Sequence, residues 1–442
     1  MQGGGGFVFL QGLASRFFER LGRALVERGE SVWRINFNGG DRAFWRLPGA
    51  TDFAGKLEDW PQFFARFLDE RGARHLILFG DCRPAHRMAI PVARAKGLRV
   101  HVVEEAYIRP GWITLEEDGV NANSRLPRDP FFYREAARSL PAWREPPEAP
   151  DGFSRRAAED LHYSAATFWA RRRFPYSHSH RPYHPSVEIA GWVRRLLLMR
   201  GAERRAAAAI AELERARGPL FLFPLQLDCD YQIRMHSPFR AVHVAIERVL
   251  SSFAANAPGS ARLMVKLHPL DNGINDWAGM VSQMAAMGGI GDRVVFLEGG
   301  DLVRLLALSR GVVTVNSTVG TWALARGVPV KTLAPAIYDL PGLTGGGDLD
   351  CFWQDPSPPD AALFDAFRRV LAARAMIPGG FFSEKGLSIA VEAAVARLQT
   401  RAAPAGFVEP DQGELTASSI NGHAAAKCSP QLGARQASSL SS

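Results

Sequence analysis

Two segments in the second half of the chain carry side chains that could bind a phosphate. Lys266-Leu267-His268-Pro269 places a histidine directly after a run of apolar residues, where its ring can donate to a phosphate oxygen. Asn316-Ser317-Thr318 offers small polar side chains at the start of an expected helix, where backbone N–H groups are also free. Core packing would explain the histidine alone and helix capping would explain Ser317 or Thr318. Together the two segments favour a phosphate site.

Two further polar side chains in this half could contact a nucleotide. Gln226 follows an apolar run in Pro224-Leu225-Gln226, and its amide can hydrogen-bond to the edge of a base or sugar. Glu298 follows another apolar run and could accept hydrogen bonds from ribose hydroxyls. A loop carboxylate is more often simply solvated, so each of these residues is a weak signal alone.

The first half of the chain carries acids at the ends of its expected strands. Three segments share this feature: Asp41-Arg42, Asp81-Cys82-Arg83 and Glu104-Glu105. An acid beside an arginine can be an ordinary surface ion pair of little energetic value. If several of these acids converge on one cleft, they would suit a nucleophile or a general base.

The elements that must position these residues alternate between strands and helices. In the first half we expect strands at 7–10, 31–37, 75–79 and 99–103, separated by amphipathic helical segments. In the second half we expect strands at 219–224, 262–267, 294–297, 312–315 and 328–333. Continuous apolar strands alternating with helices predict parallel sheets covered on both faces, whose ligands lie at the carboxyl ends of the strands.

This alternation of strands and helices predicts an α/β protein with two Rossmann-like domains that face a cleft. We assign residues 1–185 to the N-terminal domain, with an irregular connecting segment from about residue 120. Residues 186–400 form the C-terminal domain, which begins with a helix and ends with a closing helix. Residues 401–442 are rich in Ala, Ser, Gly and Gln and are expected to be a disordered tail.

Composition excludes several classes of protein. The 442 residues are 47% hydrophobic, which is enough for two cores, and no apolar run is long enough to span a membrane. P-loop, GxSxG and HExxH motifs are absent, and no nucleic-acid-binding module is recognisable. The net charge of +8 comes almost entirely from arginine and indicates an anionic partner, unless it reflects genomic base composition. The four scattered cysteines favour a reducing cytoplasm.

Taken in order, the motifs resemble capsule polysaccharide biosynthesis proteins of the KpsS/LipB type. The resemblance rests on Phe9-Leu10-Gln11-Gly12, Asn36-Phe37-Asn38-Gly39-Gly40-Asp41 and the segment from Glu104 to Glu116. It continues through Pro224-Leu225-Gln226, Lys266-Leu267-His268-Pro269, Asn316-Ser317-Thr318 and Phe382-Ser383-Glu384-Lys385-Gly386, so it covers about residues 7–395. The order of the motifs is specific, although each motif alone is not.

The resemblance implies a retaining β-Kdo glycosyltransferase of GT-B arrangement that uses CMP-Kdo. Such an enzyme would add the first Kdo to a (lyso)phosphatidylglycerol acceptor and start the linker that carries the capsule polysaccharide. It would work in the cytoplasm, peripherally on the inner face of the cytoplasmic membrane, beside other capsule biosynthesis and export proteins. The alternatives are a GT-B enzyme with another nucleotide-sugar donor and a non-catalytic component of capsule export.

The resemblance also gives the residues their expected roles. Glu104, Glu105 or Asp81 would be the nucleophile; the family often reads Glu-Asp-Gly where this chain has Glu104-Glu105-Ala106. The expected donor-binding residues are Gln226, Lys266, His268, Pro269, Glu298, Asn316, Ser317 and Thr318. Asp41, Arg42, Arg83 and Arg109 are expected to contact the acceptor or the Kdo carboxylate. We expect no cofactor and no metal, although Asp228-Cys229-Asp230 has the form of a metal-binding acid pair.

Overall fold

The structure is a computed structural model that describes residues 6–149, 151–177 and 185–399. The expected tail at 401–442 lies outside the described residues. Residues up to Gln399 belong to one compact unit, which contains two separate β-sheets.

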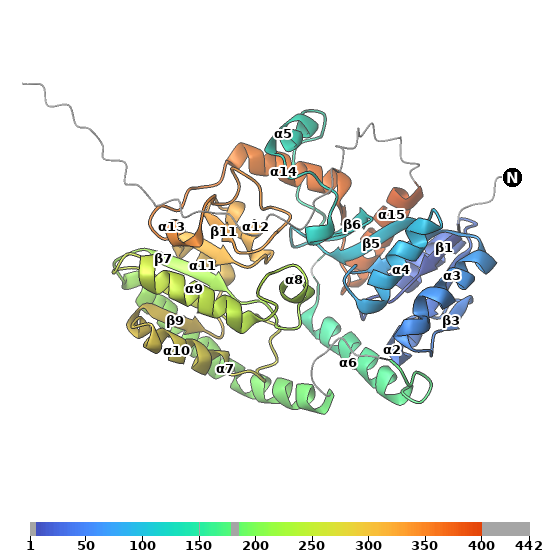
Figure 1. The fold of residues 1–442 in the computed structure, drawn as a ribbon, viewed down its shortest axis with the longest axis horizontal. Helices are drawn as coiled ribbons and strands as arrows, with labels where there is room; N and C mark the ends of the chain where they lie inside the picture. The colour runs from blue at the N-terminus through green and yellow to red at the C-terminus, as the bar shows by residue number, and fades with distance from the viewer. Residues whose placement is uncertain (1–5, 150, 178–184, 400–442) are drawn as a thin grey trace, which may run out of the picture. The chain divides into compact units, whose positions relative to one another are not determined.

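The first sheet has seven strands in the order β12-β6-β5-β4-β1-β2-β3. Figure 1 labels β1, β3, β5 and β6 of this sheet. Its first five strands in the chain are parallel, β6 runs antiparallel to β5, and β12 runs antiparallel to β6. The strands are β1 (Gly6–Phe9), β2 (Val32–Asn36), β3 (Ala50–Asp52), β4 (Ala73–Phe79), β5 (Arg99–Glu105), β6 (Trp112–Glu117) and β12 (Met376–Pro378).

Helices cover both faces of this sheet because its central strands are apolar on both sides. Ile77 and Phe79 of β4 pack with α1 (Phe17–Val26) and α15 (Glu384–Gln399). Leu76 and Leu78 point to the opposite face and pack with α3 (Trp60–Arg71) and α4 (Pro84–Ala95).

The second sheet has five parallel strands in the order β11-β10-β7-β8-β9. They are β7 (Leu220–Pro224), β8 (Arg262–Lys266), β9 (Val294–Leu297), β10 (Gly311–Thr314) and β11 (Val330–Thr332). One face packs against α9 (Val242–Asn256), α10 (Trp277–Met287) and α13 (Leu349–Phe352). The other packs against α7 (Pro185–Arg215), α11 (Leu302–Leu308), α12 (Val319–Leu324) and α14 (Ala361–Arg374). The expected α/β class with two Rossmann-like sheets is confirmed.

Two sequence expectations need revision. The segment from residue 120 is not irregular throughout, since it forms α5 (Pro130–Arg138) and α6 (Phe153–Trp169). Asp129 caps α5 by accepting from the N–H of Phe131, and Pro130 opens that helix, where its missing N–H costs nothing. The chain also returns to the first sheet after the second, because Ile377 pairs with Ile113 and Phe381 packs in the first core.

The shorter elements are α2 (Gly39–Ala43), α8 (Tyr231–Arg234) and the single 3₁₀ turns Leu57–Asp59, Asn121–Asn123 and Gly291–Arg293. Among the helices of the described ranges, none is both long enough and apolar enough to cross a bilayer.

Candidate active site

Glu104 and Glu105 end strand β5, so they lie at the carboxyl edge of the first sheet. Glu104 Oε1 accepts from the N–H of Glu105 at 3.0 Å. Glu105 makes two ion pairs at 2.7 Å, one from each carboxylate oxygen, with Arg109 and with Arg156 of α6. Adjacent residues of a strand point to opposite faces, which gives the two carboxyl groups different surroundings.

These surroundings drive the two pKa values apart. Desolvation raises the pKa of Glu104 to about 8, and the charge of Glu105 pushes in the same direction. Burial also opposes ionisation of Glu105, but Arg109 and Arg156 outweigh it together and lower its pKa to about 2. At neutral pH Glu105 is therefore a carboxylate and Glu104 is mostly protonated. A pair of acids separated in this way can divide the roles of nucleophile and proton carrier.

Arg156 is a site residue that the sequence reasoning missed. It lies on α6, and Tyr163 and Thr167 follow on the same helix. The spacing of the three residues places them on one face of that helix. The Tyr163 hydroxyl donates to Asp41 Oδ1 at 3.0 Å, and Thr167 Oγ1 accepts from the N–H of Gly40 at 3.0 Å. The spacing of these three polar residues was the one signal in the sequence.

Gly40 allows this close approach of α6 to the turn after β2. A Cβ at Gly40 would lie 2.6 Å from the ring of Tyr163, so a larger residue would push the helix away. Gly39 and Gly40 of the Asn38-Gly39-Gly40-Asp41 motif thus form the surface on which α6 packs. Because Arg156 lies on α6, this packing also holds Arg156 beside Glu105.

His268 follows β8 of the second sheet and lies close enough to the Glu105 ion pairs for their charges to act on its ring. Desolvation lowers its pKa to about 4, and the charges of Glu105, Arg109 and Arg156 also act on it. The N–H of Leu270 donates to His268 Nδ1 at 3.1 Å, so the proton of the neutral ring lies on Nε2. His268 is therefore a neutral imidazole with one N–H available as a donor.

Gln226 and Asn316 lock the ends of β7 and β10 together. The Gln226 amide donates to Asn316 Oδ1 at 3.0 Å and accepts from the N–H of Asn316 at 3.2 Å. Asn316 Nδ2 in turn donates to the carbonyl of Gln232 at 3.0 Å. The amide of Gln226 is thus engaged with the protein, and its observed role is to hold Asn316.

Ser317 and Thr318 lie at the start of α12. The Ser317 hydroxyl accepts from the N–H of Val319 at 3.2 Å, while Thr318 makes no side-chain capping bond. Thr318 and Asn316 line a small pocket together with Tyr107 and Asn121 from the first half of the chain. Thr321 Oγ1 donates to the carbonyl of Tyr107 at 2.8 Å, which ties this helix to the end of β5.

Asp41 and Asp81 are buried and accept hydrogen bonds from the loops around them. Asp41 forms a buried ion pair with Arg34 at 3.3 Å and accepts from the N–H of Phe37 at 3.0 Å. Asp81 Oδ2 accepts from the N–H of Val120 at 3.1 Å and from Asn123 Nδ2 at 3.0 Å. Both acids hold loops in place, in contrast to the two glutamates.

The expected cations divide into two groups. Arg109 pairs with Glu105, and Arg83 acts on Glu104 while donating to the carbonyl of Gly12 at 2.8 Å. Arg42 is exposed and pairs with Asp52 at 2.8 Å, so it is held by a different partner. Arg83 and Arg109 are therefore the cations beside the glutamates.

The remaining donor candidates have structural partners. Lys266 Nζ donates to the carbonyl of Gly299 at 3.2 Å, and the carbonyl of Pro269 accepts from Arg195 at 3.2 Å. Glu298 pairs with Arg205 at 2.6 Å on the surface. Asp228 accepts from the N–H of Val242 at 2.9 Å, and Asp230 accepts from the N–H of Gln232 at 2.9 Å. Both acids therefore cap backbone N–H groups at the starts of helices.

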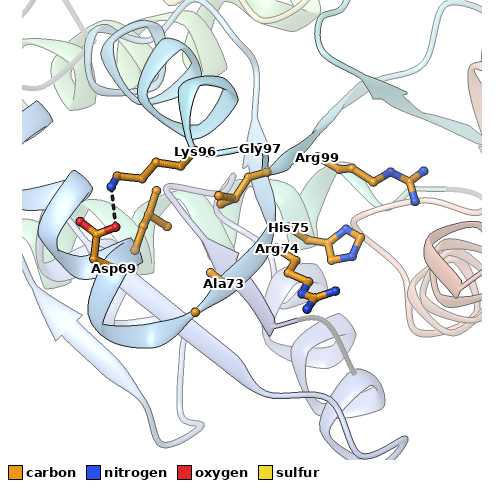
Figure 2. A pocket seen from close by; sticks show the side chains of 10 residues that line it. Asp69, Ala73, Arg74, His75, Lys96, Gly97 and Arg99 are labelled. Atoms are coloured by element: carbon orange, nitrogen blue, oxygen red, sulfur yellow. Dashed lines mark hydrogen bonds and ion pairs between the residues drawn. The ribbon is translucent and has the colours of Figure 1, made fainter. Parts of the chain in front are cut away.

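A second hollow lies at the opposite edge of the first sheet. Figure 2 shows it at the amino ends of β4 and β5, with Arg74, His75 and Arg99 beside the Lys96–Asp69 ion pair. Ligands of parallel sheets bind at the carboxyl ends of the strands, where Glu104 and Glu105 lie. The cluster around Glu105 and His268 is therefore the candidate active site.

Comparison with known proteins gives consistent matches over most of the chain. A family model described as capsule polysaccharide biosynthesis protein matches residues 74–382. The capsule polysaccharide export protein KpsS of Escherichia coli is 33% identical over 382 residues, which are 85% of this chain and 96% of that protein. The capsule polysaccharide modification protein LipB of Neisseria meningitidis serogroup A is 33% identical over 389 residues, which are 85% and 91% of the two chains. Among solved structures, the β-Kdo 2,7 transferase of Thermosulfurimonas dismutans KpsC has 14% identity and a TM-score of 0.42, and covers 89% of this chain and 100% of its own.

Proposed function

The chain belongs to the capsule polysaccharide biosynthesis family, and we propose that it is a retaining β-Kdo glycosyltransferase. In this proposal it uses CMP-Kdo and adds the first Kdo to a (lyso)phosphatidylglycerol acceptor. The observation that carries the proposal is the meeting of the Glu104-Glu105 pair with the neutral His268 of the other sheet. Retaining transfer from a nucleotide sugar uses an ionised acid as nucleophile and a hydrogen-bond donor to the leaving phosphate. Glu105 and His268 supply these two groups.

Glu105 is the proposed nucleophile because it is ionised at any working pH. Its carboxylate attacks the anomeric carbon of Kdo while the bond from that carbon to the phosphate oxygen of CMP breaks. The result is a glycosyl-enzyme ester and free CMP. Attack by the acceptor hydroxyl then inverts the carbon a second time and releases Glu105, which gives net retention.

His268 and the Asn316–Thr318 turn are proposed to bind the leaving phosphate. Negative charge grows on CMP as its bond to Kdo breaks, and donors already in place stabilise that charge. His268 offers its Nε2–H because Nδ1 already accepts from Leu270. The Gln226–Asn316 lock holds the turn in position before the donor arrives.

Glu104 is proposed as the base that takes the proton of the acceptor hydroxyl. Only the ionised form of Glu104 can accept this proton, and its pKa of about 8 keeps a fraction of the carboxyl group ionised near neutral pH. Arg109 and Arg156 flank Glu105, and the carboxylate of Kdo is attached directly to the anomeric carbon. The two arginines are therefore placed to bind the sugar carboxylate beside the nucleophile.

The proposed acceptor lies in an anionic membrane, and exposed apolar side chains on α6 and α7 support docking there. Trp169 at the end of α6 is 81% exposed and Leu197 of α7 is 79% exposed. Further exposed apolar residues on these helices are Phe153, Leu161, Phe168, Val193, Leu196, Leu198 and Met199. Exposed Arg200 and Arg204 follow on α7, so this helix exposes both apolar and cationic side chains, as interfacial helices do.

The activity test is incubation with CMP-Kdo and a fluorescent lysophosphatidylglycerol, with the product mass as readout. We expect a mass increase of one Kdo and release of CMP. His268→Ala should lower kcat about 100-fold or more, since it removes a preorganised donor. His243→Ala, on an exposed face of α9, is the matched control.

The outcomes separate the alternatives. Turnover with CMP-sialic acid or a UDP-sugar, and none with CMP-Kdo, would replace the donor. Lipid binding without turnover of any donor, unchanged by His268→Ala, would identify a non-catalytic export component.

Membrane docking is tested by flotation with phosphatidylglycerol vesicles and with neutral phosphatidylcholine vesicles. We expect salt-sensitive binding to the anionic vesicles alone. Leu197→Ser should weaken it about 10-fold, because a buried leucine contributes roughly 1.5–3 kcal/mol. Met287 of α10 is 82% exposed, and Met287→Ser is the control. Equal binding to both vesicles would contradict the proposal.

A further inference from the structure

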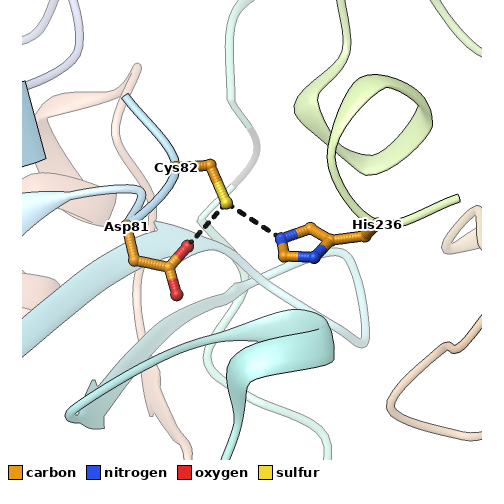
Figure 3. Close-up of side chains that lie close together, drawn as sticks. All are labelled: Asp81, Cys82 and His236. Carbon is orange, nitrogen blue, oxygen red and sulfur yellow. Dashed lines mark hydrogen bonds between the residues drawn. The ribbon is translucent and has the colours of Figure 1, made fainter. Parts of the chain in front are cut away.

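A thiol, an imidazole and a carboxylate converge beside the first sheet. Asp81 and Cys82 follow strand β4, and His236 follows helix α8, so the three come from distant parts of the chain. Cys82 Sγ lies 3.2 Å from Asp81 Oδ1 and 2.9 Å from His236 Nε2. Figure 3 shows both side chains directed at the sulfur, and the three potential ligand atoms all lie within 4.8 Å of one another.

The spacing of these atoms fits one small metal ion. Zinc binds cysteine sulfur at about 2.3 Å and histidine nitrogen or carboxylate oxygen at about 2.0–2.2 Å. Ligands at such distances around a tetrahedral ion are on the order of 3–4 Å from each other. The distances from the sulfur to Asp81 Oδ1 and to His236 Nε2, and the limit of 4.8 Å on the oxygen–nitrogen distance, fit that geometry without a large movement.

The second oxygen of Asp81 is already held in place. Asp81 Oδ2 accepts from the N–H of Val120 and from Asn123 Nδ2, which leaves Oδ1 directed at the cluster. Hydrogen bonds of this kind to the outer atoms of a ligand orient it and are typical of metal sites. Asp81 and Cys82 are buried and His236 is half-buried, so solvent can reach the cluster from the side of the histidine.

We propose that Asp81, Cys82 and His236 bind a zinc ion, with water in the fourth position. Binding releases the proton of the thiol, so the thiolate and the carboxylate together balance the charge of the ion. Soft and borderline ligands of this type favour zinc over magnesium or calcium. The ion would join the loop after β4 to the segment after α8, and so tie the first sheet to the loop that follows β7.

This proposal does not depend on the glycosyltransferase assignment, because its readout is metal content. The full chain is expressed with zinc in the medium, freed of excess metal by gel filtration and measured by elemental analysis. We expect about one zinc per chain in the wild type. Cys82→Ser and His236→Ala should each lose most of it. Cys229 is a half-buried cysteine outside this cluster, and Cys229→Ser should keep the zinc.

A spectroscopic measurement on the wild-type chain covers the case in which a variant fails to fold. Replacement of zinc by cobalt should give the near-ultraviolet absorption of a cobalt–thiolate bond. A chelator should also lower the thermal unfolding temperature of the wild type, and of Cys229→Ser, while leaving His236→Ala unchanged. Metal-free wild type after growth with zinc, or cobalt binding without thiolate absorption, would overturn the proposal. Zinc retained in full by Cys82→Ser would do the same.

Discussion

Two pairs of acids at one edge of the first sheet have opposite surroundings. Asp41 and Asp81 are covered by other parts of the chain, which supply backbone N–H groups and side chains to their carboxylates. Glu104 and Glu105 are half-buried and face His268 and Asp230 of the other half. All four acids end a strand or follow one closely, with Asp41 in the short helix α2 after β2. The position relative to a strand therefore does not decide the role of an acid.

What covers each acid decides its role. Asp41 receives the hydroxyl of Tyr163 from α6, and Asp81 receives the loop that contains Asn123. Glu105 receives two arginines whose remaining N–H groups can still bind a substrate carboxylate. A satisfied acid orders the protein, while an ionised acid beside donors of the other sheet can react.

The largest effect expected from this contrast is on turnover by Glu105→Gln. The amide keeps the size of the side chain but cannot attack the anomeric carbon, so kcat should fall about 10,000-fold, as for other nucleophile replacements. The assay is CMP release at saturating CMP-Kdo. Glu117→Gln, at an exposed ion pair with Arg99, is the control and should keep its activity. A Kdo adduct trapped on another residue would move the nucleophile elsewhere.

The second effect is on stability at the covered acids. Asp41→Asn leaves Arg34 buried with no counter-charge, so the free energy of unfolding should fall by about 3–5 kcal/mol. Asp69→Asn breaks an exposed pair with Lys96 and should cost less than about 1 kcal/mol. Urea unfolding followed by circular dichroism compares the two variants. Equal losses would show that burial does not separate these acids.

The sequence predicted the sheets well because the signal for a buried strand is local. Continuous apolar runs at 75–79 and 219–224 became central strands β4 and β7. The same local rule placed Glu104, Glu105 and His268 at strand ends, where the structure brings them together. The roles proposed for them remain predictions.

The sequence could not predict contacts made by polar faces across long separations. Helix α6 has no buried residue and packs through Tyr163 and Thr167 onto Gly39 and Gly40, so the contacts that place it are made by polar side chains and glycines. Arg156 was missed for that reason. Cys82 and His236 are 154 residues apart, and neither lies in a spaced ligand motif. Only the folded chain brings such residues together.

The smallest effect expected is the pH dependence of stability at Glu104. Its folded pKa of about 8 lies above the value of 4.5 expected when exposed, so the protonated form stabilises the fold. That contribution is complete below about pH 4.5 and is lost as pH rises toward 8. Between pH 6.5 and 7.5 the loss is at most about 1.4 kcal/mol, one pH unit of a single group.

Glu105 has the opposite sign, because its pKa is lowered to about 2 by Arg109 and Arg156. Its contribution is present above about pH 4.5 and is lost only as pH falls toward 2, so it is constant between pH 6.5 and 7.5. Glu104→Gln should therefore flatten the stability profile in this window, while Glu105→Gln, which removes one of the charges that raise the pKa of Glu104, should flatten it less. Urea midpoints measured at several pH values check both variants. An unchanged slope in Glu104→Gln would mean that Glu104 is already ionised near neutral pH, and it would remove the division of roles between the two glutamates.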